Sequence, residues 1–337
     1  MSTPRTGILA AGNFIVDYVK VIDEYPQQDM LANILSESRS NGGGPYNVLR
    51  DLAALQVLYP LSACGLVGDD ANGHWIREDC LAHGINVSQV HATTAQATSY
   101  TDAMTVEATG RRTFFHRRGA NAFFDASHIN FEAANARILH LAYLMLLDRL
   151  DERDALGQSR AARLLSAAQL AGIETCVDMV STENPAFQQI ALSALPFTDH
   201  LIVNELEASR VLGGNIAADD AASLTNAARR LLEAGVGRTA TIHTVHGAVC
   251  AARTGETCIQ PALSLPFGYS KGATGAGDAF AAGLLHGLHE SWPLPERLLL
   301  AVCVAGASLS HPTPSQGVLP IAGCLSLGST FGFNDFG

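Results

Sequence analysis

Short apolar segments alternate with amphipathic ones through the second half of the chain. From residue 137 onward, runs of strand length are continuously apolar, and the segments between them repeat apolar residues every three or four positions. Strands that are apolar on both faces, with helices between them, indicate a mostly parallel sheet covered on both sides. The predicted strands are 138–146, 175–179, 200–203, 239–245 and 249–252, and the predicted helices are 155–171, 185–195, 205–212, 218–234, 275–289 and 295–309.

The first half of the chain has a more varied pattern. The segment from Thr6 to Asp17 predicts a buried strand that breaks at a glycine and presents polar residues at its end. Residues 98–106 and 113–117 alternate in the manner of strands around a turn at Thr109-Gly110, which predicts a β-hairpin. The other elements expected here are a glycine-rich turn at 41–45, helices at 46–58 and about 73–83, and a strand at 61–67.

Composition limits the class of protein. With 337 residues, 47% of them hydrophobic and only 16% charged, the chain can bury one large core, with or without a small subdomain. The net charge is −11 and the 21 Lys and Arg are scattered, so we expect no nucleic-acid partner. The apolar runs are too short to cross a bilayer. The seven cysteines form no CxxC pair and the N-terminus lacks an apolar signal segment, which favours a cytoplasmic location.

The most specific string in the sequence runs from Lys271 to Gly283, KGATGAGDAFAAG. Its small residues would let backbone N–H groups approach an anion, and the helix that follows adds partial positive charge at its N-terminus. A transferring phosphoryl group needs such a preorganised set of donors. The Asp278 carboxylate would accept the proton of an attacking hydroxyl. An ordinary helix N-cap is the structural alternative for Asp278.

This string resembles the C-terminal signature of the ribokinase/PfkB carbohydrate-kinase family, D-T-T-G-A-G-D-A-F-x-x-G. The resemblance implies an ATP-dependent phosphotransferase with a ribokinase-like, Rossmann-type α/β sandwich, a mostly parallel central sheet and a small β-sheet lid. Gly272-Ala273 stands where the family has Asp-Thr, an aspartate linked to monovalent-cation binding, so potassium dependence stays open. The implied roles are Asp278 as catalytic base, Gly275, Ala276 and Gly277 as the anion hole, and Thr274 as an ATP contact.

A second family signature, a Gly-Gly pair before a helix that starts near an Asn, is matched at 41–48. Glycines let backbone lie against a polyol, and an Asn side chain both donates to and accepts from hydroxyls. Alone, this motif means only a turn before a helix. Asp17 stands where the family presents a substrate-binding aspartate, although a solvated loop aspartate is the alternative. The implied substrate-binding residues are Asn13, Asp17, Gly42, Gly43 and Asn47.

Residues 204–208 resemble the family's N-x-x-E motif, and the segment 241–248 resembles its nucleotide-binding turn. Asn204 and Glu207 would hold magnesium beside ATP, largely through water, because Mg²⁺ keeps several waters in its shell. The same pair also fits an ordinary capping box. Thr244 and Gly247 are the further ATP contacts that the resemblance implies. The histidine pairs lack the other ligands of a zinc set, so no direct metal site is expected.

The resemblance also implies the domain organisation: a single kinase domain at 1–320, a lid formed by about 18–40 and 97–118, and a tail at 321–337 that it leaves unexplained. Lid strands of this family often pair between subunits, which favours a homodimer through the lid. The expected partners are therefore a sugar, ATP and a second copy of the chain. A nucleoside kinase of the same fold and a non-catalytic sugar-binding regulator are the alternative functions.

Overall fold

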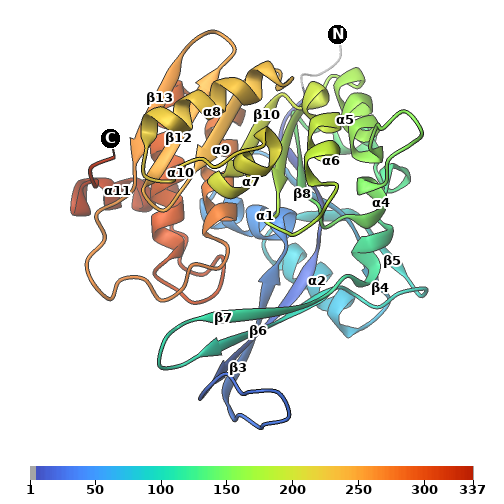
Figure 1. Cartoon of the computed structure of the whole chain (residues 1–337). Coiled ribbons are helices and arrows are strands. Elements are labelled where there is room, and N and C mark those ends of the chain that lie inside the picture. Colours follow the sequence, from blue (N-terminus) through green and yellow to red (C-terminus); the bar gives the residue numbers. More distant parts are fainter. Residues whose placement is uncertain (1–4, 337) are drawn as a thin grey trace.

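One nine-stranded sheet runs through the middle of the protein (Figure 1). The computed structural model describes residues 5–336. Neighbouring strands pair in parallel from one end of the sheet up to the last two strands, which form antiparallel pairs. In spatial order the strands are β5 (Asn86–Thr93), β4 (Leu61–Gly68), β1 (Ile8–Gly12), β8 (Ile138–Leu144), β9 (Glu174–Met179), β10 (His200–Asn204), β11 (Thr239–His243), β12 (Gly247–Ala252) and β13 (Thr257–Pro261).

Helices cover both faces of this sheet, so the core is divided into two hydrophobic layers. Both layers are built from the alternate, inward-facing residues of the same strands, which is why those strands read as continuously apolar. One face carries α3 (Phe131–Ala134), α4 (Asp148–Asp151), α5 (Arg160–Leu170), α6 (Phe187–Ala194), α7 (Glu205–Leu212) and α8 (Ala221–Glu233). The other carries α1 (Gly44–Ala54), α2 (Ala71–Ala82), α9 (Ala276–His289), α10 (Leu294–Ser308) and α11 (Ile321–Phe331).

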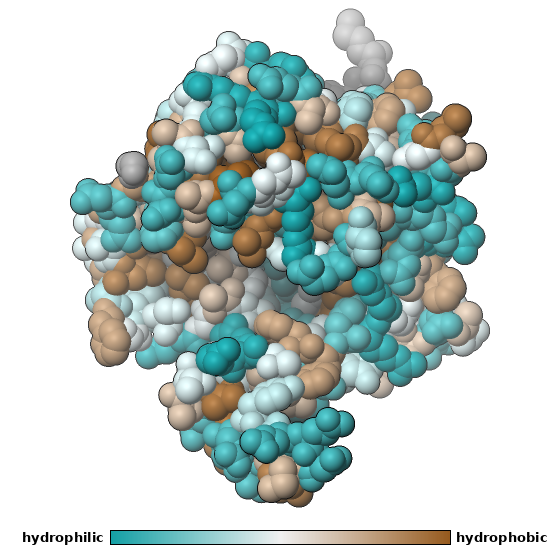
Figure 2. Space-filling view, in the orientation of Figure 1, coloured by the Kyte–Doolittle hydropathy of each residue, from teal (hydrophilic) through white to brown (hydrophobic). Residues whose placement is uncertain are grey.

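A separate four-stranded sheet projects from one side of this body and is called the lid below (Figure 1). Its order is β3 (Ile34–Gly42), β2 (Ile15–Ile22), β6 (Tyr100–Val106) and β7 (Arg112–Arg117). The predicted hairpin is confirmed, because β6 and β7 pair in antiparallel register. Figure 2 shows a hollow between the lid and the body. The fold class predicted from the sequence, a mostly parallel α/β sandwich with a small β lid, is confirmed.

The buried strand predicted from Thr6 is confirmed and breaks at a glycine, as expected, but it ends there and does not continue to Asp17. The segment forms two strands in different sheets, and Asp17 lies within β2 of the lid rather than at the end of a central strand. The break falls after Gly12, whose φ is +127°; a Cβ there would lie 2.0 Å from the Ala142 carbonyl oxygen. Only glycine avoids both the strain and this clash.

Other boundaries differ by a few residues. The helix predicted at 155–171 begins only at Arg160, because the Ser159 hydroxyl accepts the Ala162 N–H (3.1 Å) and caps it. The sequence analysis missed β5 and β13, two strands in which buried and exposed residues are mixed or the residues are only partly buried. The tail from residue 321 forms α11, whose fully buried Cys324 packs in the second core layer. No helix within residues 5–336 is long and apolar enough to cross a membrane.

Candidate active site

The carboxyl ends of the parallel strands bring polar side chains to the edge of the sheet beneath the lid. Tyr143 lies near the end of β8, Asp178 near the end of β9, Asn204 at the end of β10 and His243 at the end of β11. Ligands of open α/β sheets bind at this edge, since loops diverge there and leave a crevice. All four residues line one cavity of about 450 Å³, and Asp278 lines it as well. This cavity is called the central cavity below.

Asp278 lies in the first turn of α9, is 4% exposed, and is held by two neutral donors. The Asn47 side-chain amide donates to one carboxylate oxygen (2.8 Å), and the Tyr143 hydroxyl donates to the other (2.5 Å). Asn47 is fixed in turn by the Asn41 amide, which donates to its side-chain oxygen (2.7 Å). The carboxylate therefore has a defined orientation. The alternative that Asp278 caps its helix is wrong, because the N-cap is Gly275.

Burial without a cationic partner changes how these carboxyl groups titrate. Desolvation raises the pKa of Asp278 to about 6, although hydrogen bonds from Asn47 and Tyr143 oppose the rise. Desolvation also raises the pKa of Asp17 to about 7, and the nearby Asp278 charge adds to the effect. Raised carboxyl pKa values in a cleft are typical of a general base that works near neutral pH.

The loop before α9 brings its backbone close to other segments. Gly275 has φ +77°, and a Cβ there would lie 2.5 Å from the Pro314 side chain. Ala276 and Gly277 follow as the first two residues of α9, and a Cβ on Gly277 would lie 3.4 Å from the His243 ring. The first N–H groups of a helix have no partner within the helix and carry partial positive charge. The structure thus brings the three residues of the predicted anion hole to the N-terminus of α9, beside Asp278.

One face of the lid carries polar side chains, and Asp17 on this face lies near Asp278. Paired strands place Asp17, Thr101 and His116 in one row across β2, β6 and β7. The Thr101 hydroxyl and His116 Nδ1 are 3.0 Å apart, and Thr101 also hydrogen-bonds to Asp17. Desolvation, together with Arg118, lowers the pKa of His116 to about 4, so its imidazole is neutral at pH 7. A Cβ on Gly42 would lie 2.4 Å from the Asp17 carboxylate, which explains the glycine there.

Asn13 and Gly43 pack together and hold the backbone next to Tyr143 in place. The Asn13 side chain accepts the Tyr143 N–H (2.7 Å) and donates to the Leu146 carbonyl (3.1 Å), and Asn13 is fully buried. Gly43 has φ +86°, and a Cβ there would lie 2.2 Å from the Asn13 carbonyl oxygen. Asn13 therefore fixes the backbone of Tyr143, and both polar ends of its side chain have partners within the chain.

Two further buried carboxylates lie beside Asp278 in the central cavity. Desolvation raises the pKa of Glu207 to about 7, and desolvation with the charges of Glu207 and Asp278 raises that of Asp178 well above its ordinary value. Asn204 and Glu207 form a capping box at the start of α7, and Glu207 also accepts the Ser181 hydroxyl (2.9 Å). The capping-box interpretation is therefore correct, and both residues nevertheless line the cavity.

These carboxylates suit a hard, oxygen-preferring cation such as Mg²⁺. Hydrogen bonds to Asn204 and Ser181 engage both oxygens of Glu207, so its contact with a metal would run through water. Asp178 accepts the Met179 N–H on one oxygen only (2.7 Å). Within residues 5–336, no group of three or more His, Cys, Asp or Glu side chains is arranged to hold a metal ion. A metal here would need oxygens from a bound ligand as well.

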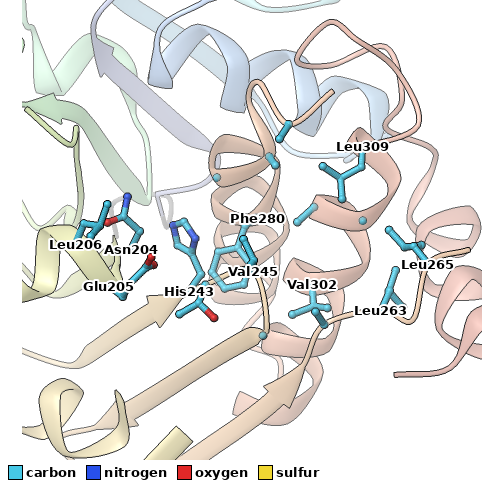
Figure 3. A pocket seen from close by; sticks show the side chains of 18 residues that line it. Asn204, Glu205, Leu206, His243, Val245, Leu263, Leu265, Phe280, Val302 and Leu309 are labelled. Carbon is cyan, nitrogen blue, oxygen red and sulfur yellow. The ribbon is translucent and has the colours of Figure 1, made fainter. Parts of the chain in front are cut away.

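A second cavity, of about 430 Å³, shares Asn204, His243 and Gly277 with the central cavity and is called the apolar slot below (Figure 3). Apolar side chains form most of its wall, among them Phe280, Val302, Leu263 and Val245. Asn204, Glu205 and His243 lie at one end. Such a slot fits a flat, largely apolar ring whose charged part points toward the polar end. Five of the residues predicted from the sequence line it: Asn204, Thr244, Gly247, Ala276 and Gly277.

The structure thus brings most of the predicted site residues together, with one clear difference in placement. Thr274 lines neither the apolar slot nor the central cavity; its hydroxyl contacts Arg112 of the lid. Sequence reasoning missed several residues of the site. They are Tyr143, Asp178, His243, Thr101, His116 and Arg112. A polar residue at the end of an apolar strand was the available signal for the first three.

Comparison with known proteins identifies the family. The model of the pfkB family carbohydrate kinases matches residues 6–321. The chain belongs to this family. Its members are phosphotransferases with hydroxyl acceptors, in agreement with the resemblance of the two sequence signatures.

Individual relatives of this pfkB family member are more distant. An ATP-dependent ribose-1-phosphate kinase of Halopiger xanaduensis is 35% identical over 92 residues, which are 27% of this chain and 30% of that protein. The structure of Arabidopsis thaliana ribokinase complexed with ribose and ATP superposes with a TM-score of 0.79 at 20% identity, over 96% of this chain and 99% of that one. A Methanocaldococcus jannaschii nucleoside kinase gives 0.73 at 17%, over 98% and 100%. These structural matches show that the fold is ribokinase-like.

Proposed function

We propose that this protein is an ATP-dependent kinase that phosphorylates a hydroxyl of a sugar or a sugar-derived substrate. The observation that carries the proposal is the position of the buried Asp278 carboxylate, in the central cavity and in the first turn of α9. The acceptor hydroxyl would lie against Asp278, which takes its proton as the oxygen attacks the γ-phosphate in line. The N–H groups at Gly275, Ala276 and Gly277 would stabilise the charge on the phosphoryl oxygens.

The lid row supports a polyol acceptor. Asp17 accepts hydrogen bonds from hydroxyls, the neutral His116 imidazole has one donor and one acceptor, and Asn47 reaches Asp278 from the same side. Closure of the lid over this region would exclude water, which would otherwise compete for the phosphoryl group. Ribose and ribose-1-phosphate, the substrates in the names of two relatives, are the first acceptors to test.

The apolar slot supports ATP as the phosphoryl donor. The adenine ring would lie against Phe280 and Val302, and the phosphates would extend past Asn204 toward the α9 N-terminus. Asp178 directly, and Glu207 through water, would hold Mg²⁺ against the phosphate oxygens. Magnesium would supply positive charge for the developing phosphoryl charge. Dependence on potassium stays open, because Gly272-Ala273 carries no carboxylate.

A coupled assay of ADP release tests this proposal. The purified protein is supplied with Mg-ATP and a panel of pentoses, hexoses, keto-deoxy acids, sugar phosphates and nucleosides. We expect ADP release well above the ATPase background with one class of acceptor. Turnover of nucleosides alone would instead favour the nucleoside kinase. If ligands bind in a thermal-shift screen but no acceptor is turned over, the regulator alternative is favoured.

The raised pKa values predict the pH dependence of the reaction. Asp278 acts as a base only when it is deprotonated, and its pKa is about 6, while that of the adjacent Asp17 is about 7. We therefore expect kcat/KM for the acceptor to rise as the pH increases through about 6 to 7 and to level off above. A profile measured from pH 5 to 9 checks this. A profile that is flat, or that falls over this range, would contradict the assignment of both carboxylates.

We also propose that the lid mediates a homodimer. Its outer face carries a cavity of about 390 Å³ lined by Ile22, Ile34, Met104 and Phe115, and both Ile34 and Phe115 are about half exposed. The edge strands β3 and β7 each have one neighbour in the lid sheet. Open edges beside an apolar face favour pairing with a second copy.

Light scattering coupled to size-exclusion chromatography tests the lid dimer. The unchanged protein should elute with a dimer mass, and the double variant Ile34→Asp, Phe115→Asp should elute as a monomer. A monomer mass for the unchanged protein at micromolar concentration would rule the dimer out. So would a double variant that stays dimeric.

A further inference from the structure

A third cavity lies where the tip of the lid meets the loop before α9. Its volume is about 570 Å³, and Gly110, Arg112 and Phe114 of the lid face residues 270–274 of the loop. Two of its lining residues, Arg112 and Lys271, are cations, and none is acidic. The whole chain has a net charge of −11, yet both charged residues that line this cavity are cations.

The register of the lid aims Arg112 at this cavity. Strand residues two apart share a face, and the paired row Val21, Thr105 and Arg112 lies four residues along from the row of Asp17, Thr101 and His116. Arg112 is therefore on the substrate side of the lid, about 13 Å from the acceptor row at about 3.3 Å per residue. Phe114, on the same face between these rows, lines both this cavity and the central cavity.

The contacts of the Arg112 guanidinium leave its charge uncompensated. It donates to the Thr274 hydroxyl, and burial lowers its pKa from the ordinary value with no opposing carboxylate. A Cβ on Gly272 would lie 2.5 Å from the guanidinium, so glycine at this position makes room for it. Burying a guanidinium without an anion beside it destabilises the folded protein unless a ligand supplies the negative charge. The planar set of N–H donors of arginine matches the oxygens of a phosphate.

We propose that Arg112, with Lys271, forms a phosphate-binding site that the lid brings to the loop of the anion hole. This inference rests on the proposed kinase function and adds a cation from the lid to it. The phosphate has two sources: the triphosphate of the nucleotide, or a phosphate carried by the acceptor. Arg112 lies on the lid, and the anion hole lies at the start of α9. A phosphate from either source that contacts both would therefore couple closure of the lid to the binding of a phosphorylated ligand.

Isothermal titration with Arg112→Gln, Arg112→Lys and the control Arg111→Gln tests the site. Arg111 is the exposed neighbour just outside β7, and its substitution removes the same charge from the lid. In the nucleotide arm, the ligands are the non-hydrolysable ATP analogue AMP-PNP with Mg²⁺, and AMP. In the acceptor arm, they are ribose-1-phosphate and ribose. Melting temperatures of all variants check that the lid change leaves the fold intact.

We expect Arg112→Gln to lower the affinity for either AMP-PNP or ribose-1-phosphate by about 10- to 100-fold, as for loss of a charge-assisted hydrogen bond. Arg112→Lys should restore part of this affinity. The affinity for AMP and ribose should change by less than about twofold, and Arg111→Gln should match the unchanged protein. The weakened ligand identifies the source of the phosphate. Equal affinities of Arg112→Gln and Arg111→Gln for both phosphorylated ligands would overturn the site. An unchanged protein that binds these ligands but releases no ADP with any acceptor would count against the kinase function instead.

Discussion

Replacing Asp278 with Asn should reduce kcat by about 100- to 10,000-fold, the range that a positioned general base contributes. The amide keeps the size of the carboxylate, but its single oxygen can accept a hydrogen bond from Tyr143 or from Asn47, not from both. It cannot take a proton from the acceptor. Steady-state ADP release gives kcat, and titration calorimetry should show that ATP and acceptor affinities change far less.

A thermal melt separates this loss from unfolding. The folded-state pKa of Asp278 is raised, so ionising this carboxyl costs the native state stability as the pH rises through about 6. The Asn variant avoids that cost but loses one of the two hydrogen bonds, so its melting temperature at pH 8 should lie close to that of the unchanged protein. A folded variant with kcat within threefold of the unchanged protein would show that Asp278 is not the base.

Asp17→Asn should lower kcat/KM for the acceptor by about 100-fold and leave the affinity for ATP unchanged. Asp17 lies in the acceptor row, away from the apolar slot, and hydrogen bonds to a charged group contribute about 1.5–3 kcal/mol each. The amide keeps one acceptor oxygen but loses the charge. Initial rates over a range of acceptor concentrations give kcat/KM, and a separate titration gives the ATP affinity.

Asp102→Asn is the matched control for Asp17. It removes a carboxylate from the same lid sheet, but from the opposite face, where Asp102 pairs with Lys20. We expect this variant to keep kcat/KM for the acceptor within about twofold. If Asp102→Asn lowers it as much as Asp17→Asn does, the effect belongs to the lid sheet as a whole and Asp17 is not a specific acceptor contact.

The two glycine-rich signatures could be recognised from the sequence alone, because each is a continuous string of residues whose local chemistry is unusual. Gly275 to Asp278 form the start of α9, and Asn47 lies in the first turn of α1, as the sequence predicted. That Asn47 donates to Asp278 was not readable, because 231 residues separate the two in sequence. The contact of Tyr143 with Asp278 could not be predicted for the same reason. In the sequence, Tyr143 is one aromatic residue in an apolar strand, and only the packing of α9 beside this strand brings its hydroxyl to Asp278.

By itself, the sequence determined the alternation of strands and helices, the hairpin at 100–117 and the loop of small residues before a helix, since these depend on neighbours along the chain. Only the tertiary structure decided that Asp17 belongs to the lid, that four strand ends converge on one cavity, and that Arg112 reaches Thr274. The physical reason is that burial, charge and hydrogen bonding depend on which segments pack together. The raised pKa of Asp278 arises from such packing, because three separate elements, α1, β8 and α9, exclude water from one carboxylate.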